Sequence, residues 1–406
     1  MFAGDLYIIS RGICVQSEGG IMKFRWPFGV WGRKRPKGFH SNVFSVPENG
    51  AKRALLCMTN GSMRRNVVRH TSSSEALFIC EVLRELGIVA DVAETFRCSS
   101  KMVEYGKYDL IIGFGPVFEA SFVSGVRAKR IFYCPGCSPI FQTLQSIRRV
   151  RDFYEKTGVW AFESGRLMNE NGLANLFLSD RVVVLGNEFT VSTMEVGGCR
   201  PKAERVNLFY FDAYDISPEI KDYAKARKHL VWFGSLGAVH KGLDLLLEVV
   251  KKRPELTLHI CGFNPRENSF ADYYQKELGN VYPNIVNHGF VDIMGADFRK
   301  LMEMSGAVVF PSASEGGSPA LLNVVANGAL IPIVSRFTGV DFVQKPFVIE
   351  ALNQDAVEQA LDAYLSLGDA ELLHLAQTFK SEVRRKYSAE NYRLRMKQIV
   401  AEVLTE

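Results

Sequence analysis

The chain has 406 residues, of which 47% are hydrophobic and 23% charged, and its formal net charge is +5. This length exceeds one ordinary hydrophobic core and predicts two domains, and the composition is that of an ordinary soluble protein. No run of about 18 apolar residues occurs, so no membrane-spanning helix is expected. Residues 1–21 also lack the basic start and apolar core of a secretory signal.

Residues 1–40 are predicted to form an N-terminal extension. Within it, residues 22–38 contain six basic residues and no acidic one, interleaved with aromatic side chains. Such a stretch can lie at an anionic lipid surface, where each charge contributes about 1 kcal/mol. A solvated arm, or a flap packed on the domain, is an equally good interpretation. No RNA- or DNA-binding module accompanies the stretch, so nucleic acid is not expected as a partner.

Residues 41–212 alternate between short apolar strands and helix-length segments, which is typical of a doubly wound parallel sheet. Strands are predicted at residues 53–58, 88–92, 110–112, 130–133 and 181–185, and an amphipathic helix at 74–87. Residues 148–180 indicate helix with turns, and residues 202–212 carry the strand-like run VNLFYF into a connector. No GxGxxG fingerprint follows the first strand, which argues against a nicotinamide-dependent dehydrogenase.

Residues 213–385 are predicted to form the second domain, again of alternating strands and helices. Its strands are expected at residues 229–234, 256–261, 285–286, 307–310 and 330–334, with a helix at 243–251. A further helix, residues 320–326, is expected to have Ser318 as its N-cap, Pro319 at its first position and Asn327-Gly328 at its end. Helical pattern dominates after residue 353, and residues 386–406 are predicted to form a final helix capped at Ser388.

The loop from Ser312 to Gly317 lies between a predicted strand and a predicted helix start. A helix N-terminus presents unsatisfied N–H groups and the positive end of the helix dipole, which suits a phosphate or diphosphate. Ligands of open parallel sheets bind at the carboxyl ends of the strands, where this loop belongs. Glu315, beside the two glycines, could accept hydrogen bonds from sugar hydroxyls. The alternative is a simple turn with a solvated glutamate.

The segment from Ser235 to Gly242 places a second glycine-bearing loop at a helix start. Lys241 supplies a point charge where a diphosphate could bind, and a developing leaving-group charge needs such stabilisation. No Asp-x-Asp metal motif flanks these loops. We therefore expect neither a metal nor another cofactor.

Eight cysteines are scattered along the chain, and two of them, Cys134 and Cys137, form a single CxxC. No second pair follows at zinc-ligand spacing, so a turn with reduced thiols is favoured over a redox or metal site. The cytoplasm is the expected compartment, with peripheral contact at the inner face of a membrane if residues 22–38 bind lipid.

The stretch from residue 307 to 341 resembles the donor-site signature of retaining GT-B glycosyltransferases of the family-4, group 1 type. That signature has two glutamates separated by seven residues. Glu315 falls on the first position, which contacts the donor sugar in the family, and Asn323 replaces the second glutamate, which holds the nucleotide ribose. Lys241-Gly242 matches the family's Lys-Gly, whereas Ser235 stands where the family has arginine. His240 or Arg336 could compensate for that missing cation.

The resemblance implies an α/β fold with two Rossmann-like doubly wound parallel-sheet domains facing a cleft, and a C-terminal helix that crosses back to the first domain. It implies that Lys241 and Glu315 are the catalytic residues and that a nucleotide diphosphate sugar is the donor. The donor-binding residues would be Gly234, Ser235, His240, Gly262, Gly289, Phe290, Val291, Glu315, Gly316, Gly317, Ser318 and Asn323. The acceptor would lie beside His70, Gly113, Gly115 and Asn187, at the edge of the first sheet.

The predicted function is transfer of a sugar, with retention, to a glycan or lipid-linked acceptor in surface polysaccharide biosynthesis. The first alternative is a non-catalytic GT-B-like scaffold subunit of a glycan-assembly complex, which Asn323 and Ser235 favour. The second alternative is a sugar-nucleotide epimerase on the same fold, which would need no acceptor.

Overall fold

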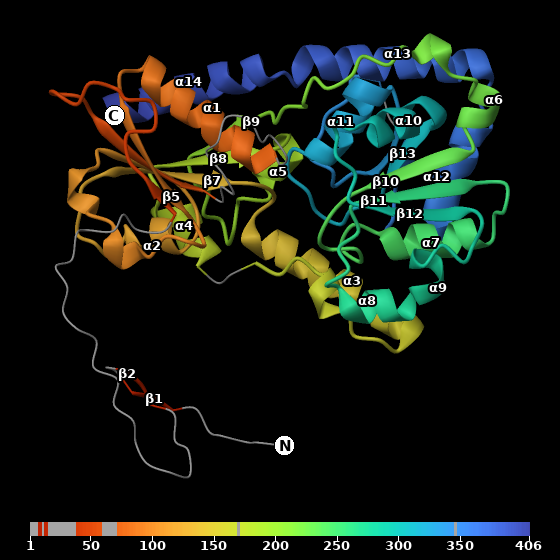
Figure 1. Ribbon diagram of the computed structural model, residues 1–406, viewed down its shortest axis with the longest axis horizontal. Coiled ribbons are helices and arrows are strands. Elements are labelled where there is room, and N and C mark those ends of the chain that lie inside the picture. The colour runs from red at the N-terminus through yellow and green to blue at the C-terminus, as the bar shows by residue number, and fades with distance from the viewer. Residues whose placement is uncertain (1–6, 10–11, 15–37, 59–70, 169–170, 345–346) are drawn as a thin grey trace. The chain divides into compact units, whose positions relative to one another are not determined.

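The computed structural model describes the chain except residues 1–6, 10–11, 15–37, 59–70, 169–170 and 345–346 (Figure 1). The chain divides into two units, residues 1–36 and residues 37–406, which are described separately. In the first unit, β1 (Tyr7–Ile9) pairs antiparallel with β2 (Gly12–Cys14). Apart from Gly38, the predicted lipid-binding stretch at residues 22–38 lies outside the described residues, and so does His70.

The first sheet of the second unit has seven strands in the order β3-β5-β4-β6-β7-β8-β9, all parallel except β3. The strands are β3 (Phe39–His40), β4 (Arg53–Met58), β5 (Val89–Glu94), β6 (Leu110–Gly113), β7 (Lys129–Cys134), β8 (Arg181–Leu185) and β9 (Ala203–Val206). Its helices are α1 (Thr71–Glu85), α2 (Pro116–Ala120), α3 (Pro139–Thr157), α4 (Gly172–Leu178) and α5 (Glu188–Ser192). The predicted strand at VNLFYF is wrong, because β9 ends at the valine of that run.

The second sheet has six parallel strands in the order β12-β11-β10-β13-β14-β15. They are β10 (His229–Phe233), β11 (Thr257–Cys261), β12 (Ile285–Gly289), β13 (Ala307–Phe310), β14 (Ile331–Ser335) and β15 (Phe347–Ile349). Its helices are α6 (Tyr223–Ala226), α7 (Leu243–Lys251), α8 (Asn268–Tyr273), α9 (Gln275–Leu278), α10 (Ala296–Met304), α11 (Pro319–Gly328), α12 (Gln354–Leu365) and α13 (Asp369–Lys386). These two sheets confirm the predicted doubly wound α/β architecture, while the domain limits at 40, 212 and 385 stay predictions.

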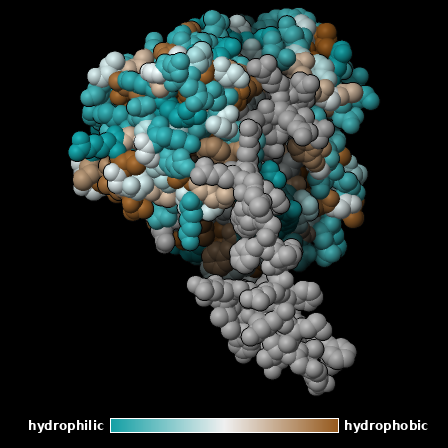
Figure 2. Space-filling view, turned by 60° about the vertical axis from the view of Figure 1, so that its left-hand side comes forward, coloured by the Kyte–Doolittle hydropathy of each residue, from teal (hydrophilic) through white to brown (hydrophobic). Residues whose placement is uncertain are grey.

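The apolar strands form the interior of both sheets because parallel strands are covered by helices on both faces. In β13, for example, the four side chains are at most 1% exposed. Figure 2 shows a face on which the described residues are mostly hydrophilic, with hydrophobic residues scattered among them. No helix among the described residues is long and apolar enough to cross a membrane.

The start and end of α11 differ from the prediction. Ser318 has a left-handed backbone (φ 42°) and makes no capping bond; its hydroxyl donates instead to the carbonyl oxygen of Thr338. Asn327 and Gly328 lie inside the helix, and Ala329, with φ 51°, ends it. Ser318 is therefore the N-cap residue by position, as predicted, but its side chain does not cap the helix, because its hydroxyl bonds to a neighbouring loop. By contrast, Ser388 accepts a bond from the Asn391 amide, which confirms it as the N-cap of the final helix.

The final helix, α14 (Ala389–Thr405), lies along α1 of the first sheet (Figure 1). Glu85 on α1 accepts bonds from Arg393 (2.6 Å) and Lys397 (2.9 Å) on α14. Between the two helices, the buried ring of Tyr392 packs against Phe209 at a centroid distance of 5.1 Å. The predicted crossing of the C-terminal helix back to the first domain is confirmed.

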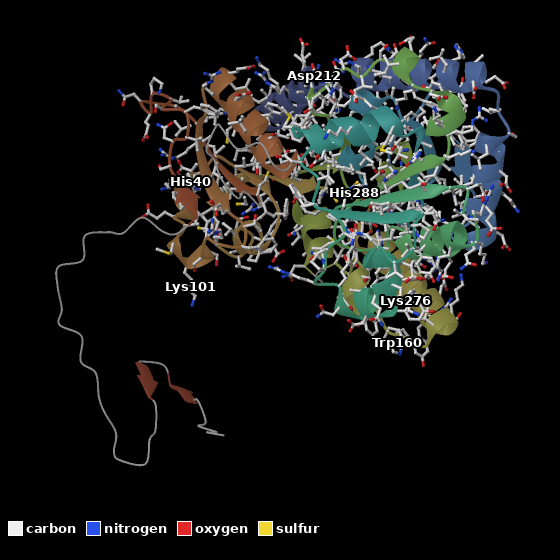
Figure 3. All side chains as sticks on the ribbon, turned by 45° about the vertical axis from the view of Figure 1, so that its right-hand side comes forward. His40, Lys101, Trp160, Asp212, Lys276 and His288 are labelled. Carbon is white, nitrogen blue, oxygen red and sulfur yellow. The ribbon has the colours of Figure 1, made fainter. Side chains whose placement is uncertain are left out.

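Helix α3 follows β7 of the first sheet but packs against helices of the second. Phe153 stacks on Phe270 of α8 at a centroid distance of 5.9 Å. Arg149 donates to both carboxylate oxygens of Asp244 on α7, at 2.8 and 2.7 Å, and both residues are buried. At the far end of α3, Trp160 (Figure 3) stacks on Tyr154. Helix α3 therefore holds the two sheets together beside the cleft.

We expect Arg149→Leu to lower the free energy of unfolding by about 3–5 kcal/mol, because it leaves the buried Asp244 carboxylate without its cation. The double variant Arg149→Leu/Asp244→Leu should recover most of that loss. Urea denaturation measures both effects. Arg151→Leu is the matched control, since Arg151 is exposed and its pair with Glu155 is worth less than about 1 kcal/mol. Equal losses in Arg149→Leu and Arg151→Leu would contradict the assignment of α3 as a bridge.

Candidate active site

A cavity of about 460 Å³ lies at the carboxyl ends of the strands of both sheets. One wall comes from the ends of β4, β6, β7 and β8 and from α1; the other comes from the ends of β10 to β13 and the start of α11. Of the predicted site residues, those that line it are Gly234, Ser235, Lys241, Gly262, Phe290, Val291, Glu315, Gly316, Gly317, Ser318 and Asn323. His240, Gly289, Gly113, Gly115 and Asn187 do not line it.

Lys241, Arg166 and Glu315 are three of the charged side chains that line this cavity. Glu315 Oε2 lies 3.4 Å from Arg166 Nη1, and Glu315 Oε1 accepts a bond of 3.0 Å from the Ser312 hydroxyl. Burial raises the pKa of Glu315, but the charges of Lys241 and Arg166 together lower it below its ordinary value. Burial lowers the pKa of Lys241, an effect that the charge of Glu315 opposes. The site therefore combines an ionised carboxylate with two cationic side chains.

Arg166 provides a cation that the sequence did not predict. It follows the short 3₁₀ turn η3 (Phe162–Ser164), and its backbone amide donates to Ser146 on α3 at 3.0 Å. The loop of Lys241 approaches it closely, since a Cβ on Gly237 would lie 2.8 Å from the Arg166 side chain. No motif in the sequence marks this arginine, because it comes from a segment far from the donor signature and is positioned only by α3.

His240 does not supply the missing cation. Its ring is buried, with Nδ1 bonded to the Ser146 hydroxyl and Nε2 to the carbonyl oxygen of Ser314, both at 2.8 Å. Burial, helped by the charge of Arg166, lowers its pKa to about 4, so the ring is neutral at pH 7. The other suggestion, Arg336, stacks over Phe337 and lines a separate cavity. Both suggestions are wrong, because each side chain is engaged elsewhere.

The backbone amides of the Ser235–Gly242 loop are partly occupied. Gly237 and Ala238 donate to the two carboxylate oxygens of Glu267, each at 2.8 Å, and Glu267 is fully buried. Lys241 instead directs its ammonium group to the hydroxyl of Ser235 at 3.3 Å. In this loop a diphosphate would therefore be bound by the lysine side chain rather than by the Gly237 and Ala238 amides.

The two glycines beside Glu315 pack against the first sheet. A Cβ on Gly316 would lie 2.2 Å from the carbonyl oxygen of Pro135, and one on Gly317 would lie 2.5 Å from Leu208. In the part of the chain that the structure describes, no group accepts a hydrogen bond from the amides of Gly316, Gly317 or Ser318. These amides lie at the N-terminus of α11 and are suited to an anion.

The CxxC turn lies behind this loop. Cys137 Sγ donates to the carbonyl oxygen of Glu315 at 3.5 Å, and Cys134 Sγ donates to that of Gly136 at 3.3 Å. Burial raises the pKa of Cys134 to about 12 and that of Cys137 to about 11, so both are unreactive thiols at pH 7. Within the described residues, no group of three His, Cys, Asp or Glu side chains could hold a metal ion.

Asn323 is used by the backbone of the connector between the sheets. Its Oδ1 accepts from the Phe211 amide at 2.8 Å, and its Nδ2 donates to the carbonyl oxygen of Pro319 at 2.7 Å. One turn later, Asn327 accepts from the amides of Ala213 and Tyr214 at 2.9 and 2.8 Å. The two asparagines form a clamp on the connector, and Asn323 touches the cavity with a side chain that is 1% exposed.

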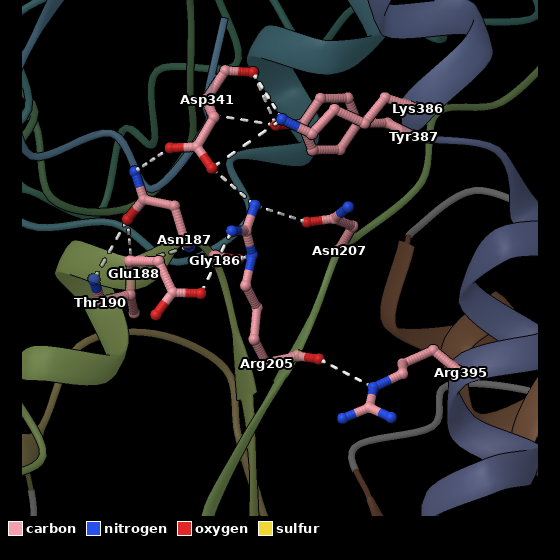
Figure 4. A network of polar contacts seen from close by, with 10 residues as sticks. All are labelled: Gly186, Asn187, Glu188, Thr190, Arg205, Asn207, Asp341, Lys386, Tyr387 and Arg395. Atoms are coloured by element: carbon pink, nitrogen blue, oxygen red, sulfur yellow. Dashed lines mark hydrogen bonds and ion pairs between the residues drawn. The ribbon is translucent and has the colours of Figure 1, made fainter.

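The predicted acceptor-side residues have structural partners. Asn187 caps α5 and donates to Asp341 at 2.9 Å; Asp341 also accepts from Arg205 at 2.6 Å and from Tyr387 (Figure 4). Gly113 and Gly115 have positive φ angles, and a Cβ would lie 1.8 Å from the Cys57 carbonyl oxygen or 2.2 Å from Thr95. Phe114, between the two glycines, lines the cavity instead, as do Glu75 and Tyr133, which no motif in the sequence marks.

Asn323→Ala should lower the free energy of unfolding by about 1–3 kcal/mol, because the Phe211 amide then loses its buried acceptor. If the clamp is the only role of Asn323, the folded variant keeps its affinity for a nucleoside diphosphate within about twofold. Thermal denaturation and calorimetric titration measure the two quantities. A tenfold weaker affinity with unchanged stability would instead support the ribose contact that the family signature predicts.

His240 should make the protein less stable in acid. Its pKa is about 4 in the folded chain and about 6.5 when unfolded, so the unfolded state binds more protons between these values. The unfolding free energy must therefore fall as the pH falls from 6.5 to 4, by up to about 1.4 kcal/mol per unit. In His240→Asn, the slope of the unfolding free energy against pH should be smaller by up to about 1.4 kcal/mol per unit, which corresponds to one proton. Urea denaturation at pH 7, 6 and 5 measures this slope. An unchanged slope would show that the ring is charged in the folded state.

Residues 227–366 match the family model described as glycosyl transferases group 1. No curated protein matches the chain by sequence. Among solved structures, HepE of Anabaena with UDP and glucose is 12% identical with a TM-score of 0.56, and sucrose-phosphate synthase of Thermosynechococcus elongatus is 14% identical with a TM-score of 0.59. Trehalose-6-phosphate synthase, in a study of transfer with retention, is 11% identical with a TM-score of 0.52.

Each of these alignments covers 87% of this chain and 99% of the other. Because the identities are low, the likeness shows the fold, and it extends over most of the chain. The predicted resemblance to GT-B glycosyltransferases is confirmed. The chain has the fold of the GT-B glycosyltransferases, and its residues 227–366 are similar to a group 1 glycosyltransferase domain.

Proposed function

We propose that the protein transfers a sugar from a nucleoside diphosphate sugar to a hydroxyl group of an acceptor. The observation that carries the proposal is the meeting of Lys241, Arg166 and Glu315 at the N-terminus of α11. Two cations beside the free amides of Gly316 and Gly317 form an anion site for a diphosphate. The carboxylate of Glu315, held by Ser312 and Arg166, is placed to accept hydrogen bonds from sugar hydroxyls.

In the reaction, the bond between the anomeric carbon and the diphosphate oxygen breaks, and a bond to the acceptor oxygen forms. Negative charge develops on the departing diphosphate, and a fixed cation is worth most when it lies where that charge develops. Lys241 and Arg166 would fill this role, and they are the reason to propose that no metal is needed. Glu315 would position the sugar. We assign no protein nucleophile.

The nucleotide is proposed to be a uridine diphosphate. Support comes from HepE, which has this fold and binds UDP and glucose. The turn after β12 lines the cavity through Phe290 and Val291, which would lie beside the base, whereas Gly289 does not line it. Retention of the anomeric configuration is proposed from the family resemblance and from trehalose-6-phosphate synthase, which was studied for transfer with retention.

The acceptor is proposed to be a glycan or a lipid-linked sugar of surface polysaccharide biosynthesis. The second candidate function is a non-catalytic scaffold of the same fold. The observation that favours it is Asn323, whose amide is bonded to backbone groups where a catalytic relative has a glutamate. The anion site remains complete in spite of this exchange, and for that reason catalysis is preferred.

Calorimetric titration with UDP, ADP, GDP and UDP-glucose tests the donor site. We expect UDP to bind with a Kd near micromolar, which is about 8 kcal/mol. Lys241→Ala should weaken UDP at least tenfold, because it removes a cation from the diphosphate. Glu315→Gln should weaken UDP-glucose tenfold or more and leave UDP nearly unchanged, because this carboxylate faces the sugar.

Lys252→Ala is the matched control, since it removes an equal charge from an exposed position directly after α7 and should change nothing. Failure of every nucleotide to bind the unaltered protein would overturn the proposed transfer reaction and favour the scaffold. Equal weakening by Lys241→Ala and Lys252→Ala would show a general charge effect rather than a site.

A further inference from the structure

Glu75 is a buried carboxyl on the wall of the cavity that the first sheet forms. It lies on α1 and is 6% exposed, yet it lines the cavity together with Tyr133 of β7. The Tyr133 hydroxyl donates to Glu75 Oε2 at 2.7 Å and lies 2.9 Å from the hydroxyl of Tyr392 on α14. Side chains from α1, β7 and α14 thus form a single chain of hydrogen bonds. Glu75 is the member of this chain at the cavity wall with a carboxyl group.

Glu75 has no cation partner among the described residues, whereas most buried acids of this protein do. Asp244 is paired with Arg149, Glu315 with Arg166, and Asp91 with Arg53. Burial of a carboxyl is costly, and acids with shifted pKa values gather at functional sites. Burial raises the pKa of Glu75 to about 7, and the bond from Tyr133 only partly opposes this shift.

The other side chains on this wall are apolar or already engaged. Met58, Phe114 and Leu185 offer no hydrogen bond, and the hydroxyl of Tyr133 is used by Glu75. The opposite wall carries Lys241 and Arg166. A diphosphate therefore belongs to the opposite wall, and a carboxyl would repel it from this one. What suits Glu75 is a neutral molecule with hydroxyl groups.

We propose that Glu75 binds the acceptor, and that the group it binds is a free hydroxyl of a neutral sugar rather than a phosphate or a uronic acid. This inference rests on the proposed function, in which an acceptor must enter the cavity beside the donor. The carboxylate accepts a hydrogen bond from the acceptor hydroxyl and holds it toward the donor site. The Tyr133 hydroxyl, which donates to Glu75, fixes the carboxyl in place, so Tyr133 is a positioning residue, whereas the hydroxyl of Tyr392 bonds to Tyr133.

The pH should change this binding in a defined direction. An ionised carboxylate is the stronger acceptor, so affinity for the neutral sugar rises as the pH passes through 7. The described groups that face Glu75 are the hydroxyls of Tyr133 on β7 and Tyr392 on α14. Burial raises the pKa of both well above the ordinary tyrosine value, so neither titrates between pH 5.5 and 8. The described charged side chains that line the rest of the cavity are those of Lys241, Arg166, Glu315 and Asp292.

The test uses the full chain saturated with UDP and titrates octyl β-glycosides of glucose, galactose and N-acetylglucosamine below their micelle concentrations. Calorimetry at pH 5.5, 7 and 8 gives the Kd of each glycoside. For the unaltered protein, we expect at least one glycoside to bind about tenfold more tightly at pH 8 than at pH 5.5. In Glu75→Gln, the affinity at pH 8 should fall about tenfold and lose its pH dependence, while the Kd of UDP is unchanged.

Tyr392→Phe is the structural comparison, because it removes a hydroxyl of the same chain and leaves Glu75 and Tyr133 in contact. It should lower the melting temperature while the glycoside Kd keeps its pH dependence. The proposal is overturned if Glu75→Gln binds the glycosides like the unaltered protein, or if no glycoside binds the UDP complex. If UDP itself does not bind, the proposed function is wrong. If UDP binds but Glu75→Gln leaves the glycoside Kd unchanged, only the role of Glu75 is wrong.

Discussion

The close approach of the Glu315 loop to the first sheet is the constraint on which the rest of the cleft depends. Gly316 and Gly317 leave no room for a Cβ against Pro135 and Leu208, so the loop after β13 rests directly on segments that follow strands of the first sheet. This contact sets the position of Glu315 and of the α11 N-terminus relative to the opposite wall. Packing between the loops thus requires glycine at both positions, and the amides of the same two glycines suit a diphosphate. The two requirements are compatible.

Charge in the cavity is balanced from three separate segments. Lys241 comes from the loop before α7, Glu315 from the loop before α11, and Arg166 from the segment after α3. The buried pair of Arg149 and Asp244 ties α3 to α7 and so holds Arg166 within reach of Glu315. A serine at position 235 is tolerable for an anion site because a cation reaches the same cavity from a different segment.

The strands and the donor loops could be predicted from the sequence because their signals are local. Apolar runs identify β4 and β8, and the Lys-Gly and glutamate positions identify the loops before α7 and α11. Arg166 and Glu75 could not be predicted, since long-range packing alone brings them to the cavity. The partners of His240, Asn187 and Asn323 could not be predicted for the same reason: each has a hydrogen-bonding group that a distant segment uses.

The position of Asn323 shows how a substitution can be absorbed by the fold. A glutamate there could accept from the Phe211 amide but could not donate to the Pro319 carbonyl, whereas an amide does both. Asn327 repeats the arrangement one turn later, so the connector is bound to α11 at two levels. Ribose binding, if it occurs here, must then depend on groups other than a carboxylate at this position. The anion site and the two sheet edges remain intact, so the loss concerns one contact and not the architecture of the cleft.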